Sequence, residues 1–120
     1  MTDRSDAEVV DLAPLFGDAT GNGVLWSLPS GAELNVNLVR LEPDAEVGEH
    51  VNDEVEVLVA VLAGSGQVTV NGLATPLHPS TLAYVPRGAR RAIHAGLEPL
   101  VYLSVHRRRE GLQVRGPRGR

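Results

Sequence analysis

Turn residues divide this chain into short extended segments. Its 13 Gly and 8 Pro fall mostly between apolar runs of four to nine residues that are rich in Val and Leu. Such runs, bounded by turn residues, predict β-strands, and Asn71-Gly72 at the end of one of them is typical of a tight hairpin turn. Residues 8–16 could form one helical turn or a loose strand. The sequence therefore predicts an all-β fold, a sandwich or a small antiparallel barrel.

The segment VEVLVAVL, residues 55–62, is apolar on both faces apart from Glu56. Successive side chains of a strand point to opposite sides of the sheet, so both sides of this strand need cover. The core of a single small barrel covers one side only. The other side must meet a second sheet or a second subunit. We therefore expect a homodimer.

The length of 120 residues allows one domain with one modest core. We expect an N-terminal arm over residues 1–23, the barrel over 24–106 and an Arg-rich tail over 107–120. No apolar run approaches the roughly 20 residues of a membrane span, and the N-terminus lacks the layout of a signal peptide. Since the chain also has no Cys, these features favour a cytoplasmic protein without a membrane partner.

Charge is distributed unevenly along the chain, and all 11 basic residues are Arg. Residues 1–60 hold 13 Asp and Glu against 2 Arg, whereas residues 61–120 hold 2 against 9. The Arg-rich tail could bind an anionic partner such as nucleic acid. The four aromatic residues, however, leave little for base stacking, which argues against nucleic acid. The tail is expected to be mobile or to fold onto the acidic half of the barrel or onto a partner subunit.

A polar run, GEHVNDEVE at residues 48–56, stands out between the apolar segments. Together with the later phrases VLAGSGQVTVNG and VPRGA, its order and spacing resemble the cupin family across about residues 33–106. The resemblance implies a small antiparallel β-barrel of jelly-roll type. It also implies two motifs that supply three His and one Glu to a metal inside the barrel. His50 stands at the first His position and Glu56 at the position of the Glu.

Two of the implied metal ligands are replaced. Asn52 stands where the first motif has its second His, and Arg91 stands where the second motif has its His. An Asn carbonyl is a weak neutral ligand, and a guanidinium stays protonated and offers only donors. We therefore expect His50, Asn52, Glu56 and Arg91 to form a ligand site in which no metal is favoured. In this interpretation Glu56 is buried beside Arg91, and their ion pair stands in for the metal.

A metal site built from other residues is the alternative. His50, Glu54 and Glu56 could hold Zn, Fe, Mn or Ni together with water. The last strand is not expected to contribute to it. His106 differs in parity from the residues that look core-facing there, which are Val101, Leu103 and Val105.

Two functions follow, and whether the chain is an enzyme stays open between them. The favoured one is a non-enzymatic or degenerate cupin that binds a small molecule, an anion in view of Arg91. The alternative is a metal-dependent enzyme, such as a dioxygenase, isomerase or decarboxylase, that acts on a small organic acid or sugar-like substrate. A third hypothesis is an interaction module that contacts a partner through the Arg-rich tail. Metal content separates the first two.

Overall fold

The computed structural model describes residues 7–29 and 31–108. Residues 1–6 of the expected arm and residues 109–120 of the expected Arg-rich tail lie outside these ranges. The described elements are the short helix α1 (Ala13–Phe16) and the strands β1 (Gly23–Ser27), β2 (Leu34–Leu41), β3 (Glu46–Val51), β4 (Val57–Ala63), β5 (Gly66–Val70), β6 (Leu73–Leu77), β7 (Leu82–Val85), β8 (Arg90–Ala95) and β9 (Leu100–Arg107).

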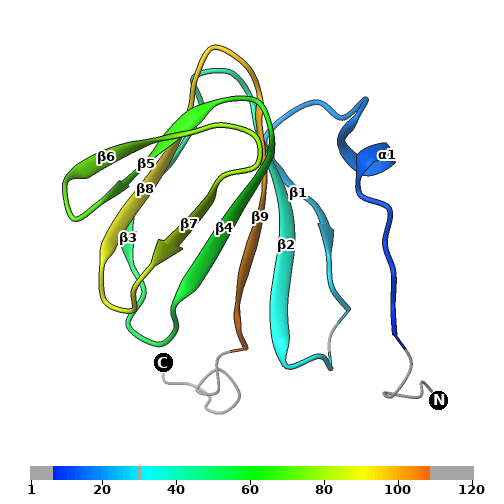
Figure 1. Ribbon diagram of the computed structural model, residues 1–120, viewed down its shortest axis with the longest axis horizontal. Helices are drawn as coiled ribbons and strands as arrows, with labels where there is room; N and C mark the ends of the chain where they lie inside the picture. The colour runs from blue at the N-terminus through cyan, green and yellow to red at the C-terminus, as the bar shows by residue number, and fades with distance from the viewer. Residues whose placement is uncertain (1–6, 30, 109–120) are drawn as a thin grey trace.

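The strands form two antiparallel sheets, ordered β1-β2-β9-β4-β7 and β3-β8-β5-β6. Figure 1 shows the two sheets facing each other around a shared interior, with β3, β5, β6 and β8 on the left. Consecutive strands often lie in different sheets, as in a jelly roll, because the chain crosses from one sheet to the other. The prediction of an all-β barrel of jelly-roll type is confirmed.

Residues with positive φ build two of the tight connections. Asn71 and Gly72, at φ values of 50° and 87°, join β5 to β6 in the predicted two-residue hairpin. Gly64, between β4 and β5, has a φ of 82°, and a Cβ atom there would lie 1.7 Å from the carbonyl oxygen of Pro99. Glycine is required at this position because the neighbouring backbone leaves no room for a side chain.

The main core lies between the two sheets. All four Val of residues 55–62 point into it, and they pack with Ile93 of β8 and with Leu100 and Tyr102 of β9. The alternate residues of the same segment therefore face away from the core. Glu56 is one of them, and its side chain is exposed. The expected burial of Glu56 is wrong, because its neighbours on both sides already occupy the core positions.

The last strand, β9, faces the opposite way from the prediction. Leu100 and Tyr102 belong to the main core, so Ser104 and His106, which share their parity, lie on the inner side as well. The expectation that His106 faces outward is wrong. The residues expected to face the core lie on the outer side instead, namely Val101, Leu103 and Val105.

Strand β2 follows the same orientation because it pairs with β9 along its whole length. Asn35 lies opposite His106 and Asn37 opposite Ser104, so both Asn residues share the inner side. Leu38 lies on the outer side and is nevertheless fully buried, apart from the main core. Both sides of this sheet are therefore partly covered. For this reason an apolar alternation alone did not reveal which side is the inner one.

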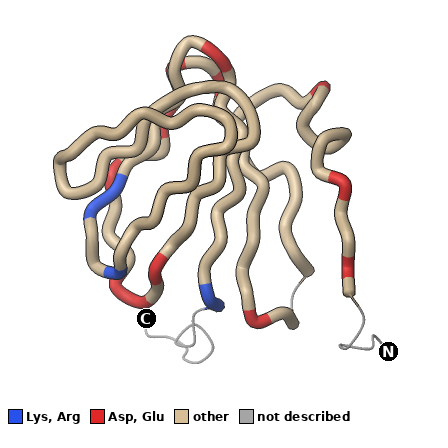
Figure 2. The backbone as a smooth tube through the Cα atoms, in the orientation of Figure 1, with Lys and Arg blue, Asp and Glu red and all other residues tan. Residues whose placement is uncertain are grey.

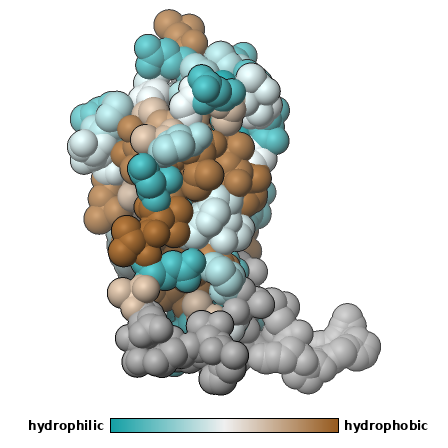
Figure 3. Space-filling view, turned by 90° about the vertical axis from the view of Figure 1, so that its right-hand side faces the viewer, coloured by the Kyte–Doolittle hydropathy of each residue, from teal (hydrophilic) through white to brown (hydrophobic). Residues whose placement is uncertain are grey.

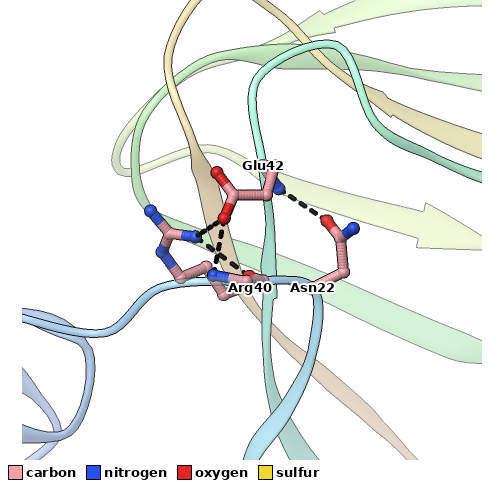
Figure 4. Close-up of polar contacts among 4 residues, drawn as sticks. Asn22, Arg40 and Glu42 are labelled. Atoms are coloured by element: carbon pink, nitrogen blue, oxygen red, sulfur yellow. Dashed lines mark hydrogen bonds and ion pairs between the residues drawn. The ribbon is translucent and has the colours of Figure 1, made fainter.

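The segment before β1 is held to the end of β2 by a polar cluster (Figure 4). The Arg40 guanidinium donates to the carbonyl oxygen of Gly21 at 2.9 Å and lies 3.3 Å from the Glu42 carboxylate. That carboxylate accepts from the Gly21 N–H at 2.6 Å, and the Glu42 N–H donates to Asn22 Oδ1 at 2.7 Å. These contacts hold the chain that leads from α1 into β1.

Within the described residues no helix is long and apolar enough to cross a membrane.

Candidate functional site in the barrel

Strand pairing brings His50 and Arg91 together. His50 on β3 and Arg91 on β8 are direct cross-strand partners. Arg91 shares the parity of Ile93, a core residue on the same strand, so the pair lies on the inner side of its sheet. The register of β3 shifts between Val47 and His50, and this irregularity turns His50 to the inner side. Because His50 is exposed and Arg91 half-buried, the pair is accessible from solvent.

Tyr102 approaches the same region from the other sheet. Burial raises the pKa of Tyr102 to about 12, and the positive charge of Arg91 opposes that rise. Tyr102 packs in the main core with Ile93, the next inner-side residue after Arg91 on β8. Since the phenol stays protonated at neutral pH, its hydroxyl can donate a hydrogen bond. Arg91 and Tyr102 therefore present hydrogen-bond donors to the interior.

Asn52 lies two residues after His50, in the turn that joins β3 to β4. Its Oδ1 accepts hydrogen bonds from the N–H groups of Glu54 at 3.0 Å and Val55 at 3.3 Å. Its Nδ2 is buried and has no hydrogen-bond partner among the residues described. The side-chain oxygen, which is the atom that a metal would need, is thus used by the turn, whereas a buried donor is left over.

The two acidic residues of the motif lie outside the barrel. Glu54 and Glu56 line a shallow cavity of about 270 Å³ together with Arg87 and Arg107. Arg107 Nη2 donates to the carbonyl oxygen of Glu54 at 3.5 Å. Figure 2 shows acidic and basic residues near one another at this end of the barrel. The expected pair between Arg91 and Glu56 does not form within residues 31–108, because Glu56 faces outward.

The residues present do not fit a divalent metal held in the manner that the motif implies. Among the residues that the structure describes, no three His, Asp or Glu side chains gather into a group that could hold one. What stands at the motif positions is an imidazole, a guanidinium and an amide whose oxygen is engaged. His50 is the single strong ligand among these three, and the positive charge of Arg91 beside it would repel a cation.

A further set of polar residues lies on the inner side of β1, β2 and β9, and no motif had pointed to it. Ser27 Oγ donates to Asn37 Oδ1 at 2.5 Å, and Asn37 Nδ2 donates to Asn35 Oδ1 at 3.2 Å. Ser104 and His106 lie opposite the two Asn on β9 and continue the row that begins at Tyr102. The alternating Asn residues of LNVNL show in the sequence that one side of this strand is polar. Only the inward orientation of β9, with which the strand pairs, shows that this polar side faces the interior.

Comparison with known proteins identifies relatives of this fold. The family model described as the cupin domain matches residues 37–106. A solved structure from Thermus thermophilus aligns with a TM-score of 0.70 at 22% identity, over 87% of this chain and 100% of that one. A Streptococcus pyogenes protein of unknown function aligns with a TM-score of 0.69 at 21% identity, over 88% of this chain and 91% of that one. A predicted oxalate decarboxylase from Thermotoga maritima aligns with a TM-score of 0.59 at 23% identity, over 61% of this chain and 64% of that one. No functionally curated protein shows a detectable match.

Proposed function

This chain belongs to the cupin family, and we propose that it is a metal-independent member that binds a small anionic molecule inside its barrel. The proposed ligand-binding groups are the His50 imidazole, the Arg91 guanidinium, the Tyr102 hydroxyl and the amide N–H group of Asn52. Glu56 is not part of this set, since it faces outward from the core.

One observation carries the proposal, namely that hydrogen-bond donors replace His at two of the three positions where the family motifs have it. Asn52 uses its oxygen in the turn, while its buried Nδ2 has no partner among the described residues. Arg91 offers only donors and carries a fixed positive charge. Donors and positive charge suit the oxygens of a carboxylate or phosphate, and they disfavour a cation.

Each proposed residue has a distinct part in binding. The half-buried Arg91 can hold a carboxylate through two parallel hydrogen bonds, and partial burial strengthens the attraction relative to bulk water. The Tyr102 hydroxyl donates from the opposite sheet. Asn37 and Ser104, further along the inner side, can bind hydroxyl groups of the same ligand. The arrangement therefore favours a small organic acid, and a hydroxylated one in particular.

The test is a binding assay on untagged protein treated with a chelator. Isothermal titration would be run against oxalate, phosphate and small hydroxy acids, with oxalate included because of the name of the Thermotoga maritima neighbour. We expect at least one of these anions to bind in the presence of chelator, and Arg91→Gln to abolish that binding. Arg90→Gln is the matched control, because Arg90 is the adjacent residue of β8 and lies on the outer side opposite Val51.

Three results would contradict the proposal. The first is stoichiometric Zn, Fe, Mn or Ni in the purified protein that is released by His50→Ala. The second is consumption of oxalate or a hydroxy acid that depends on added metal, which would support the enzymatic alternative instead. The third is equal binding by the Arg90 and Arg91 variants, which would show that the anion does not bind in the interior.

A further inference from the structure

The outer side of the five-stranded sheet carries two continuous apolar rows that run across its central strands. In the first row Val36, Val105, Leu58 and Tyr84 lie side by side on β2, β9, β4 and β7. In the second row the neighbours on the same strands are Leu38, Leu103, Ala60 and Leu82. We refer to these eight residues as the outer-sheet patch. It contains no charged side chain.

Several side chains of this surface are open to solvent. The exposed fractions are 38% for Leu58, 65% for Leu82 and 54% for Tyr84, and 50% for Leu34 at the edge of the patch. On a scale of roughly 200 Å² for a fully exposed large side chain, these fractions amount to roughly 400 Å² of apolar surface. An apolar area of this size falls in the range of the largest patch on a typical monomeric protein, and such patches are often functional.

The described N-terminal segment covers a different part of the sheet. Phe16 and Ala19 border a cavity with Arg40 and Val101, one row beyond the outer-sheet patch. In Figure 1, α1 and the chain before it lie beside β1, at the far edge of the sheet from β4 and β7. Leu38 of β2 is already fully buried in the single chain, so the open part of the patch is centred on β4 and β7, away from this segment (Figure 1).

We propose that the outer-sheet patch is the interface of a two-fold homodimer. A standard interface buries roughly 800 Å² per partner, a little more than half of it apolar, so the patch supplies about the apolar share that a stable dimer needs. Two identical faces of twisted antiparallel sheets can pack with their strands nearly aligned, as in a sandwich. The interface thereby completes the cover that the doubly apolar strand β4 requires on its outer side.

Charge favours a second copy over the Arg-rich tail as the occupant of this surface. The tail would bring several guanidinium groups to a patch that has no carboxylate to receive them. At the edge of the patch, by contrast, Glu56 and Arg107 follow the first row with one charge of each sign. A second copy therefore meets an apolar centre and a polar rim without net charge, which is the usual anatomy of an interface.

A competing apolar surface lies at the β1 edge. Figure 3 views this side of the molecule and shows hydrophobic side chains in its middle, separated by hydrophilic ones. Val24 of β1 and Val9 before α1 are among the exposed apolar residues of these elements. They do not form continuous cross-strand rows as the outer-sheet patch does, so we assign the interface to the patch. A variant at Val24 distinguishes the two surfaces.

The experiment measures mass in solution by light scattering and sedimentation for the full chain and four variants, one of them Val24→Glu at the competing surface. We expect wild type to be a dimer, and Leu58→Glu to weaken dimerisation by about 100-fold or more, because two-fold symmetry places the new charge in the interface twice. Leu82→Glu is a second variant at a more exposed position of the patch, where folding is not at risk. Leu73→Glu on β6 is the matched control, since Leu73 is an exposed Leu of the other sheet.

The outcomes separate the alternatives. The proposal is supported if both patch variants are folded monomers, as judged by circular dichroism and urea unfolding, while Leu73→Glu stays dimeric. It is overturned if wild type is monomeric at about 100 μM, a concentration at which a specific interface of this size should be occupied. It is also overturned if Val24→Glu dissociates the dimer and the patch variants do not.

Discussion

Replacing Asn52 by Asp separates anion binding from metal binding at a single atom. The substitution keeps the Oδ1 acceptor that caps the turn after β3 and converts the unpartnered Nδ2 donor into an oxygen. For two unit charges about 4 Å apart, Coulomb's law gives about 4 kcal/mol of repulsion at an effective dielectric constant of about 20. If solvent screens half of this repulsion, about 2 kcal/mol remains. With the loss of the hydrogen bond from Nδ2, the anion should bind more weakly by roughly 2.5 kcal/mol, or about 50-fold in affinity.

Calorimetry in the presence of chelator measures that affinity, using whichever anion of the panel binds wild type most tightly. Asn52→Ala is the control for stability, because it removes the cap and leaves the buried N–H of Val55 without its acceptor. We expect Asn52→Ala to lower the free energy of unfolding by about 1–2 kcal/mol, and Asn52→Asp to change it by less than about 1 kcal/mol. If Asn52→Asp binds the anion as tightly as wild type does, the unpartnered amide is not part of the site and the reasoning fails.

Two further predictions concern the fold. Gly64→Ala should lower the free energy of unfolding by about 2–4 kcal/mol, since it adds a backbone clash to the cost of positive φ. Gly72→Ala has open space around the new methyl group and should lower it by about 1 kcal/mol. Equal losses in urea unfolding would refute the role given to Pro99. The hydrogen bond to Asp44 raises the pKa of His94. NMR titration should therefore find a higher His94 pKa in wild type than in Asp44→Asn. This contribution to stability is present below the unfolded pKa and disappears as pH rises through the folded pKa, so wild type should lose more stability than Asp44→Asn between about pH 6 and pH 8.

Much of the architecture could be predicted because it rests on local signals. Asn71-Gly72 specifies a hairpin through two residues that accept positive φ, and the structure has that hairpin. The doubly apolar segment at residues 55–62 predicts a strand that needs cover on both sides, and in the structure its Val side faces the core. These features depend on residues next to one another in the chain, which a single sequence displays directly.

The orientation of individual side chains could not be predicted where it depends on distant strands. The sequence predicts the apolar Val101, Leu103 and Val105 of β9 as inner residues, but these lie on the outer side, which is apolar too. The register shift before His50, which turns this residue inward, has no signal in the sequence. The same holds for Asn52, where the motif position suggested a ligand but gave no indication that its oxygen is used by the turn.

The most direct test of the central claim is a crystal structure of the protein grown without added metal and soaked with the best-binding anion. We predict an anion oxygen at about 3 Å from the Arg91 guanidinium and another within hydrogen-bond distance of Asn52 Nδ2. Tyr102 would face the same molecule from the opposite sheet. A metal ion coordinated by His50, with Arg91 turned away from it, would contradict the account.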